Sequence, residues 1–293
     1  MVTSRASLKE RLNEKDIIVA PGVFDALSAS LAENAGFDTL YLSGASLAYT
    51  KLGQPDIGLL SFTEIADSLW RISDRTHASI IADCDTGFGN ALNAMRCVKM
   101  LERAGATAIQ LEDQTYPKRC GHLAGKTLVP LPEMVGKLKA ALDARQNEET
   151  MIVARTDALG VIGTQEAIDR ALAFKECGVD MVFIEGIRSD DDIQQIMTSL
   201  NGEIPIMANM VEGGETPLKN AKILESLGFS LVIFPGALVR AFTAMASEFF
   251  ATLKQDGTTD NFHERMLNFK QLNDYLGTAD MLALGQKYEG EQQ

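Results

Sequence analysis

The sequence predicts an α/β protein folded as a single (β/α)8 TIM barrel with a helical extension at its C-terminus. Short apolar segments rich in strand-forming residues alternate with amphipathic segments of helical period along most of the 293-residue chain. Apolar strands of this kind are typical of a parallel sheet that is buried on both faces. Strand-then-helix units repeat eight times over about 240 residues, and this repetition favours a closed barrel.

The eight predicted strands are residues 17–20, 39–42, 79–83, 108–112, 151–155, 180–185, 204–209 and 231–235. The predicted helices are residues 26–35, 63–75, 91–104, 133–144, 165–177 and 190–200, followed by a long one over about 237–254. Several helical segments end at a glycine before the next strand, as helices commonly do. An open doubly wound sheet is the alternative fold, but the turn after the first strand, A-P-G-V-F, lacks its G-x-G-x-x-G motif.

The domain organisation follows from these elements. We expect residues 1–255 to form the catalytic barrel domain. Residues 256–293 form a C-terminal helical tail that belongs to the same domain or to a subunit interface. Because the barrel leaves this tail no partner within its own chain, we expect it to pack on a neighbouring subunit.

Composition and charge narrow the class of function. The formal net charge of −13 argues against binding to nucleic acids or anionic membranes, because phosphate contacts need clustered Lys and Arg. The four cysteines have no zinc-type spacing, which fits a reducing compartment. The first residues lack the apolar core of a signal peptide and no segment reaches about 18 apolar residues, so we expect a cytoplasmic protein.

Polar side chains collect where the predicted strands end, which is where barrel enzymes place their active sites. A single polar residue there is usually a helix cap, the interpretation that Ser43 or Asp157 alone would receive. Acidic residues from three consecutive strands, however, repel one another unless a cation holds them. The candidates at or just after the strand ends are Ser43, Gly44, Ala45, Asp83, Asp85, Glu112, Arg155, Glu185, Asn209 and Pro235.

Asp83 and Asp85 share one face of the predicted strand, and the glycines that follow allow the backbone to approach a ligand. Few protein ligands, all of them oxygen atoms, suit Mg²⁺, with Mn²⁺ as the alternative ion. Calcium takes more protein oxygens, and zinc takes His or Cys, whereas two of the three histidines lie far from this face. Asp56 lies in a loop that could reach the same ion; the alternative is a turn residue.

The segment E-D-Q-T-Y-P-K-R-C-G-H, residues 112–122, adds a thiol to this face. Lys118, Arg119 and His122 flank Cys120, a setting that lowers a cysteine pKa and makes the thiol reactive. The alternative is a buried, inert cysteine. A metal chelating a 2-hydroxy or 2-oxo acid, Arg155 on a second anionic group and an acid/base thiol suit chemistry through an enolate. Covalent catalysis is less favoured, because no Asn or Asp orients His122 in an evident triad.

At these residues the chain resembles the isocitrate lyase / phosphoenolpyruvate mutase superfamily. The most specific elements are K-R-C-G-H at residues 118–122 and D-C-D-T-G-F-G at residues 83–89. Matching segments also occur at residues 41–44, 53–56, 112–114, 154–157 and 209–214, so the similarity covers nearly the whole chain. The resemblance implies a Mg²⁺-dependent barrel, a homotetramer built from dimers that exchange their eighth helix, and a mobile K-R-C-G-H loop that closes over the substrate.

The resemblance also implies roles for single residues. Asp83 and Asp85 hold the metal directly or through water, with Glu112 and Asp56 assisting. Cys120 protonates an enolate, while Lys118 and His122 tune it. The residues that bind or shape the substrate are Arg155, Ser43, Gly44, Ala45, Asp56, Gly121, Glu185, Asn209 and Pro235. Cys84 replaces the alanine or glycine common between the two aspartates and either narrows the site or packs in the core.

The implied branch is a carbon–carbon lyase for a 2-hydroxy di- or tricarboxylate of the 2,3-dimethylmalate or 2-methylisocitrate type. A retro-aldol reaction would give a 2-oxo acid such as pyruvate and a second carboxylate. The N-M-V-E-G-G segment at residues 209–214 also looks like oxaloacetate hydrolases and carboxyphosphonoenolpyruvate mutase, so a hydrolase and a phosphonomutase are alternatives. A dicarboxylate sensor is a third alternative, which would leave the poised thiol unexplained.

Overall fold

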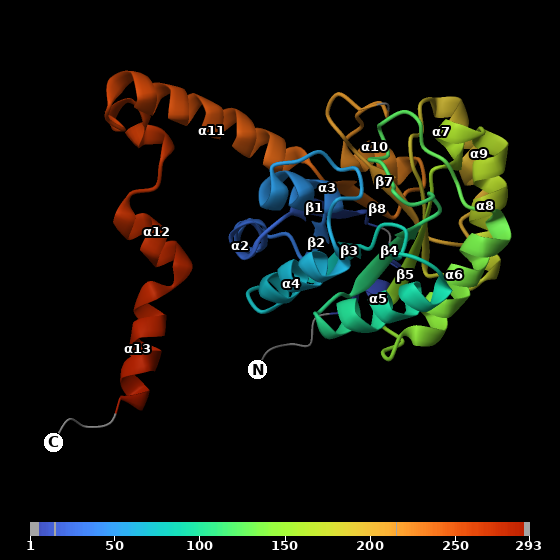
Figure 1. The fold of residues 1–293 in the computed structure, drawn as a ribbon, viewed down its shortest axis with the longest axis horizontal. Helices are drawn as coiled ribbons and strands as arrows, with labels where there is room; N and C mark the ends of the chain where they lie inside the picture. Colours follow the sequence, from blue (N-terminus) through green and yellow to red (C-terminus); the bar gives the residue numbers. More distant parts are fainter. Residues whose placement is uncertain (1–5, 15, 215, 290–293) are drawn as a thin grey trace. The chain divides into compact units, whose positions relative to one another are not determined.

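The computed structural model describes residues 6–14, 16–214 and 216–289. Eight parallel strands form a closed barrel in which each strand pairs with the next in sequence and the last pairs with the first (Figure 1). The strands are β1 (Ile18–Val23), β2 (Thr39–Leu42), β3 (Ser79–Asp83), β4 (Ala108–Glu112), β5 (Met151–Thr156), β6 (Met181–Ile184), β7 (Ile206–Asn209) and β8 (Leu231–Phe234). The predicted (β/α)8 barrel is therefore confirmed.

Six main helices match the predicted segments to within two residues at each end. They are α2 (Ala26–Asn34), α4 (Phe62–Ser73), α5 (Ala91–Arg103), α6 (Leu131–Ala144), α8 (Thr164–Glu176) and α9 (Asp190–Leu200). Short elements that the periodicity did not predict lie before β1 or in the connections. They are α1 (Leu8–Arg11), α3 (Gly44–Leu47), the π-helix η1 (Ala48–Leu52), α7 (Ala158–Val161) and α10 (Ala221–Ser226).

The first strand departs most from its predicted bounds, because it continues to Val23 instead of ending at residue 20. The Pro-Gly pair at residues 21 and 22 is typical of a turn in the sequence. In the sheet, however, Pro21 pairs with Phe234 and Gly22 with Tyr41. Pairing with a strand on each side therefore outweighs the local turn preference at this position.

Side chains fill the inside of the barrel, so its centre is a packed core and not a channel. This inner cluster includes Tyr41, Ile81, Val153 and Phe183. A second apolar cluster lies between the strands and the surrounding helices. Because the centre is filled, small molecules can meet the strand residues only at the mouth of the barrel.

The chain divides into two compact units, the first ending at Val239 and the second beginning at Arg240. The second unit contains most of α11 (Ala237–Asp256), the 3-10 helix η2 (Asp260–Arg265), α12 (Phe269–Leu276) and α13 (Thr278–Tyr288). Large apolar side chains are exposed along it, and Phe269 is 87% exposed. The division at residue 255 and the packing of the tail on a neighbour stay predictions.

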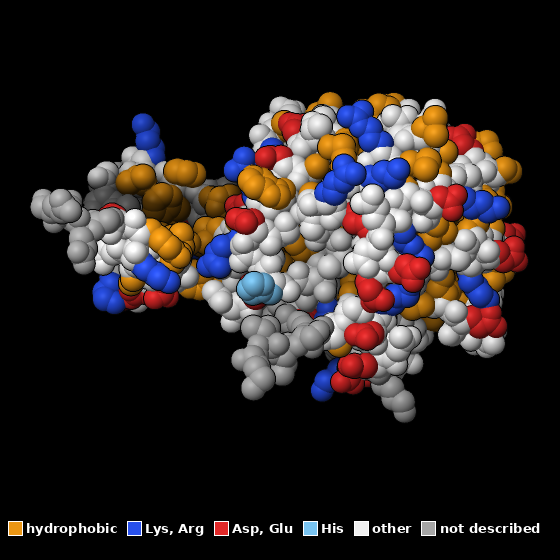
Figure 2. Space-filling view, turned by 90° about the horizontal axis from the view of Figure 1, so that it is seen from below, with side chains coloured by type: hydrophobic (Ala, Val, Ile, Leu, Met, Phe, Trp, Pro, Cys, Tyr) orange, Lys and Arg blue, Asp and Glu red, His pale blue; other side chains and the backbone are white. Residues whose placement is uncertain are grey.

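On the face drawn in Figure 2, acidic and basic side chains are interspersed over the barrel. None of the helices among the described residues combines the length and the apolar character needed to cross a bilayer.

Candidate active site

The C-terminal ends of β3, β4 and β5 bring the central charged residues together. Asp83 ends β3, Glu112 ends β4, and Glu112 pairs with Arg155 across the β4–β5 ladder. Arg155 Nη1 lies 3.3 Å from Glu112 Oε2. Parallel pairing therefore fixes the spacing of these groups before any loop contributes.

The carboxylates of Asp83 and Asp85 converge on the backbone of Gly44. A Cβ atom at residue 44 would lie 3.2 Å from Asp83 Oδ2 and 3.4 Å from Asp85 Oδ1. The N–H of Gly44 donates to Asp83 Oδ2 at 3.4 Å. Asp85 adopts a left-handed φ of 46°, a conformation that Asp tolerates better than most residues and that often marks functional sites. A glycine at residue 44 lets the backbone approach both carboxylates, which a Cβ atom would crowd.

These carboxylates are strongly desolvated. Burial raises the pKa of Asp85 to about 6; the nearby Lys118 opposes this rise, while Asp83 and Asp56 add to it. Burial also raises the pKa of Glu112 well above its usual value, although Arg155 acts against it. Glu112 Oε1 is buried and accepts no hydrogen bond. A buried acceptor without a donor is costly, and a cation would relieve that cost.

The donor set fits a hard divalent cation with few protein ligands. Among the described residues, no three His, Cys, Asp or Glu side chains lie close enough together to enclose a metal. Two carboxylates beside a glycine backbone instead suit an ion that completes its shell with water and substrate oxygens, as Mg²⁺ does. The chemistry of the residues is thus compatible with Mg²⁺ and unlike that of a closed zinc or calcium site.

Lys118 connects the loop to the carboxylates. Its Nζ atom lies 2.7 Å from Asp85 Oδ1 and 2.7 Å from Asp56 Oδ1. Burial lowers the pKa of Lys118, but Asp85 and Asp56 outweigh it and hold this pKa well above its usual value. Asp56 is buried and ion-paired, so its side chain takes part in the charged cluster and is more than a turn residue.

Arg155 lies among three carboxylates. Its Nε donates to Asp157 Oδ2 at 2.9 Å, and its Nη2 lies 3.6 Å from Glu185 Oε2. Asp157 is therefore occupied by Arg155, and its side chain does not cap α7, contrary to the helix-cap interpretation of the sequence. Ser43 does act as a cap, since its Oγ accepts from the N–H of Ser46 at 3.2 Å at the start of α3.

The K-R-C-G-H loop lies directly on this cluster. A Cβ atom at Gly121 would lie 2.5 Å from Arg155 Nη2 and 2.7 Å from Glu185 Oε2. The N–H of Cys120 donates to the carbonyl of Asp56 at 3.1 Å. Gln114 holds Arg119, because its amide both accepts from the Arg119 N–H and donates to the Arg119 carbonyl, each at 2.9 Å. The loop is therefore in a closed position that places the half-buried Cys120 at the site.

The expected lowering of the Cys120 pKa is wrong. Burial raises the pKa of the thiol, and Asp56 and Glu185 act in the same direction, while the His122 N–H and Arg155 lower it without offsetting the rise. The two cations that flank Cys120 in sequence point elsewhere. Lys118 pairs with Asp56 and Asp85, and the Arg119 guanidinium donates to the Ala124 carbonyl at 2.8 Å. A protonated thiol suits a proton donor better than a nucleophile.

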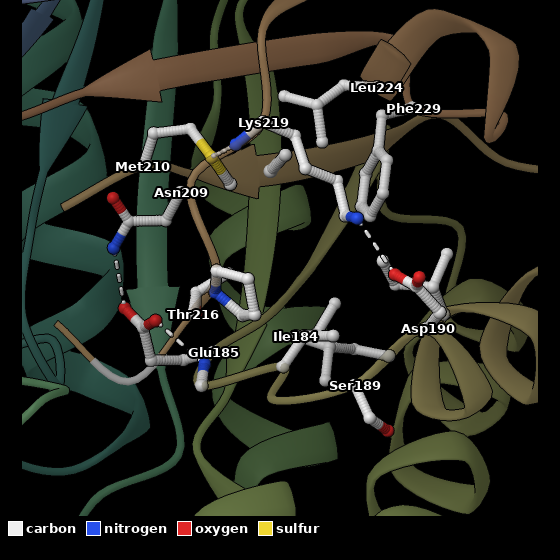
Figure 3. Close-up of a pocket in the computed structure, with 15 residues that line it drawn as sticks. Ile184, Glu185, Ser189, Asp190, Asn209, Met210, Thr216, Lys219, Leu224 and Phe229 are labelled. Carbon is white, nitrogen blue, oxygen red and sulfur yellow. Dashed lines mark hydrogen bonds and ion pairs between the residues drawn. The ribbon is translucent and has the colours of Figure 1, made fainter. Parts of the chain in front are cut away.

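Glu185 and Asn209 form the side of the site next to His122. Asn209 Nδ2 donates to Glu185 Oε2 at 2.9 Å, and His122 Nε2 lies 3.9 Å from Glu185 Oε1. Figure 3 shows a mostly apolar pocket beside this pair, with Lys219 and Asp190 joined on its far side. This pocket is partly open to solvent, and its free volume of about 20 Å³ is room for about one water molecule. The pocket is therefore too small to hold a dicarboxylate.

Sequence reasoning missed residues that support the site from below. The Tyr41 hydroxyl donates to Gln110 Oε1 at 3.1 Å, and Gln110 Nε2 donates to Asp83 Oδ1 at 3.3 Å. The signal was a polar residue in the middle of an apolar strand, A-I-Q-L-E. Lys126, which lies beyond the motif, contacts Asp157 and had no such signal.

The other candidates have structural partners. Ala45 follows Gly44 in the first turn of α3. The carbonyl of Pro235 accepts from Ser46 Oγ at 2.8 Å, so this residue joins the end of β8 to α3. Cys84 is fully buried in the apolar core, which favours the packing interpretation of this residue.

Comparisons with known proteins identify the family of the chain. The family model described as phosphoenolpyruvate phosphomutase matches residues 8–254. A 2,3-dimethylmalate lyase from Eubacterium barkeri is 42% identical over 98% of this chain and 99% of its own length. A 2-methylisocitrate lyase from Aeropyrum pernix is 39% identical over 93% of this chain and 87% of its own.

Solved structures also resemble this chain. Oxaloacetate acetylhydrolase with 3,3-difluorooxalacetate has a TM-score of 0.91 and 32% identity, covering 98% of this chain and 97% of that one. A 2,3-dimethylmalate lyase, described as a PEP mutase/isocitrate lyase superfamily member, has a TM-score of 0.90 and 36% identity over 99% and 98%. The chain belongs to the phosphoenolpyruvate phosphomutase family, within the PEP mutase/isocitrate lyase superfamily that the sequence motifs predicted.

Proposed function

We propose that the protein is a cytoplasmic, Mg²⁺-dependent carbon–carbon lyase of the 2,3-dimethylmalate or 2-methylisocitrate type. It would cleave a 2-hydroxy di- or tricarboxylate to a 2-oxo acid such as pyruvate and a second carboxylate. The observation that carries the proposal is the closed loop, which brings Cys120 to a site where Asp83 and Asp85 converge beside Arg155. Similarity to two proteins named as lyases supports the same class.

Asp83 and Asp85 would hold the ion, with Glu112 and Asp56 close enough in the cluster to act through water or through Lys118. A bound Mg²⁺ would act as a Lewis acid that stabilises negative charge on the 2-oxygen and its neighbouring carboxylate. Mn²⁺ would accept the same oxygen ligands.

The residues of the chain supply the remaining steps. A carboxylate of the cluster would take the proton of the 2-hydroxyl, the C2–C3 bond would break as C2=O forms, and the electron pair would pass to C3 and into its carboxylate. The Cys120 thiol then gives its proton to C3, and its raised pKa keeps that proton available. Arg155 would bind a substrate carboxylate. Lys118 would anchor the loop on Asp56 and Asp85, and His122 would lie beside Glu185.

The surrounding surface would determine which substituents fit. The backbone at Ser43, Gly44 and Ala45 would contact the end of the substrate near the metal. Gly121, Glu185 and Asn209 would contact the other end, and Pro235 would close the wall through its link to Ser46.

We also propose that the protein is a homotetramer in which the helical tail packs on a neighbouring copy. Exposed apolar side chains on α11, α12 and α13, among them Phe250, Phe269 and Met281, support an interface. Light scattering on the full chain tests this, and a monomer at micromolar concentration would contradict it.

The test of the reaction is a substrate panel. The panel contains 2,3-dimethylmalate, 2-methylisocitrate, isocitrate and oxaloacetate, each with Mg²⁺ and with EDTA. Release of pyruvate is followed with lactate dehydrogenase, and glyoxylate and oxalate are measured separately. We expect pyruvate from one of the first two acids and none with EDTA. Oxalate release from oxaloacetate alone would assign the hydrolase instead. Formation of a C–P bond in a separate assay with carboxyphosphonoenolpyruvate would assign the phosphonomutase.

Cys120→Ser isolates the role of the thiol. Turnover should fall by roughly 100- to 10,000-fold, the usual contribution of a general acid, because a hydroxyl is a much weaker proton donor. Pyruvate binding should stay near the wild-type value. The matched control is Cys177→Ser, which changes a half-buried thiol at the C-terminus of α8 and should leave turnover unchanged. Wild-type turnover in the Cys120 variant would reject the acid role.

A further inference from the structure

Lys126 lies at the end of the closed loop and joins it to the barrel. Its Nζ donates to the carbonyl of Gly121 and lies 2.8 Å from Asp157 Oδ1. The side chain is 6% exposed, although the residues just before it are exposed. A lysine buried in a surface loop has given up hydration, and its two contacts must compensate for that loss.

Asp157 is the second half of this connection. It is fully buried and accepts from Arg155 Nε at 2.9 Å as well as from Lys126. Its own N–H donates to Asp113 Oδ1 at 2.9 Å, so the carboxylate is fixed to the end of β4 through the backbone. Asp157 thus links the loop cation to the arginine of the site.

The carboxylates around Arg155 outnumber its single positive charge, so a second cation is needed to balance them. Arg155 alone faces the carboxylates of Glu112, Asp157 and Glu185. Lys126 supplies a second positive charge to Asp157, and together with Arg155 it keeps the pKa of Asp157 below its usual value despite burial. Arg155 Nη2 also donates to Asp157 Oδ1 at 3.2 Å, so Asp157 fixes the arginine through two nitrogens while its Nη atoms lie near Glu112 and Glu185.

From this geometry we propose that Lys126 is a positioning residue that holds the loop closed and fixes Arg155 at the same time. The held atom is the carbonyl of Gly121, the residue between Cys120 and His122. Loop closure and the orientation of Arg155 are therefore coupled through Asp157. The proposal rests on the proposed function only where turnover is measured, since closure of the loop needs no substrate.

The direct test measures how accessible Cys120 is in the resting enzyme. Wild type and Lys126→Met are treated with iodoacetamide, and modification of Cys120 is followed by peptide mass mapping, with Cys177 as an internal reference. Losing a charge-assisted contact of this kind shifts an equilibrium by roughly 10- to 100-fold. We expect Cys120 to react about tenfold faster in Lys126→Met and Cys177 to react at its wild-type rate.

Three further variants separate positioning from general damage. Lys126→Arg keeps the charge and the donors and should restore most of the protection, and Lys126→Gln should lie between Arg and Met. Lys175→Met removes a lysine that pairs with Glu203 on the surface and should change neither rate. In turnover, Lys126→Met should lower kcat more than it raises KM, because the loop closes less often while Arg155 keeps its own contacts to Asp157 and Glu112. If Lys126→Met does not fold, the Gln variant carries the same comparison.

Unchanged alkylation of Cys120 in a folded Met or Gln variant would show that Lys126 does not hold the loop closed, whatever the enzyme does to its substrates. Absence of lyase activity in every variant and in wild type would instead reject the proposed function and leave the accessibility result standing.

Discussion

Replacing Gly121 by alanine tests whether the loop must lie directly on the site for turnover. The backbone of this residue does not need a left-handed conformation, so an alanine is allowed there by its own torsion angles. The obstacle is space, because the new Cβ would lie 2.5 Å from Arg155 Nη2, 2.6 Å from Glu185 Cγ and 2.7 Å from Glu185 Oε2. All three distances are shorter than a van der Waals contact, so either the loop or both side chains must move.

The size of the effect follows from the cost of overpacking. One added methyl group in a filled site costs about 1–3 kcal/mol. The loop can relieve this strain by opening, which would lower the closed population by about 5- to 150-fold. We therefore expect kcat/KM to fall by that factor and Cys120 to become more reactive toward iodoacetamide. The melting temperature should change little, because the strain is relieved in the loop and not in the core.

Gly136→Ala is the matched control. Gly136 lies within α6, and a Cβ atom there would meet nothing within 4 Å. Alanine in a helix is favoured over glycine by about 1 kcal/mol, so this variant should melt a few degrees higher with unchanged turnover. Wild-type kcat/KM together with wild-type alkylation in Gly121→Ala would refute the idea that catalysis uses the loop position seen in the structure.

Three further outcomes are expected. Mg²⁺ at about 100 times its Kd should stabilise the protein by about 2.7 kcal/mol, or roughly 5 °C in a thermal shift assay. Asp85→Asn should abolish this thermal shift. The control, Asp67→Asn on the exposed face of α4, should retain it. Activity should persist at alkaline pH, since burial raises the pKa of the Cys120 thiol and the thiol stays protonated until the pH passes that raised value. A loss of kcat centred at pH 7–8 that disappears in Cys120→Ser would contradict this. Glu185→Gln should weaken substrate binding more than metal binding, because Glu185 contacts Arg155 and Asn209 rather than Asp83 or Asp85. Isothermal titration with Mn²⁺ and with substrate measures both affinities, and a larger loss of Mn²⁺ affinity would contradict this.

Most of the fold could be predicted because the signals are local and repeat along the chain. β2, β3 and β4 begin and end at the predicted residues, since each is a short apolar segment bounded by polar or turn residues. The short helices α3 and α7 could not be predicted in this way, because four residues carry no periodicity. β1 was predicted too short because the pairing of Pro21 and Gly22 with two neighbouring strands is a property of the closed sheet.

Part of the candidate site could likewise be predicted from the sequence, and part of it could not. The convergence of Asp83, Glu112 and Arg155 follows from the topology, since the ends of consecutive parallel strands meet at one mouth. The charge state of Cys120 does not follow from sequence, because neighbours in the chain need not be neighbours in space. Lys118 and Arg119 flank the thiol in the sequence, yet one pairs with two aspartates and the other with a backbone carbonyl.

The positions of Lys118 and Arg119 in the structure support the proposed role of Cys120 as a proton donor. If Lys118 faced the sulfur, it would favour the thiolate, and the loop would carry a nucleophile or metal ligand into the site. Because Asp56 and Asp85 take up Lys118, the thiol keeps its proton while the lysine anchors the loop to the carboxylates of the site. Lys126 holds the other end of the same loop on Asp157. Lys118 and Lys126, on either side of Cys120, thus bind carboxylates of the barrel. In the proposed reaction, loop closure would therefore bring a neutral acid to the carbon that is protonated.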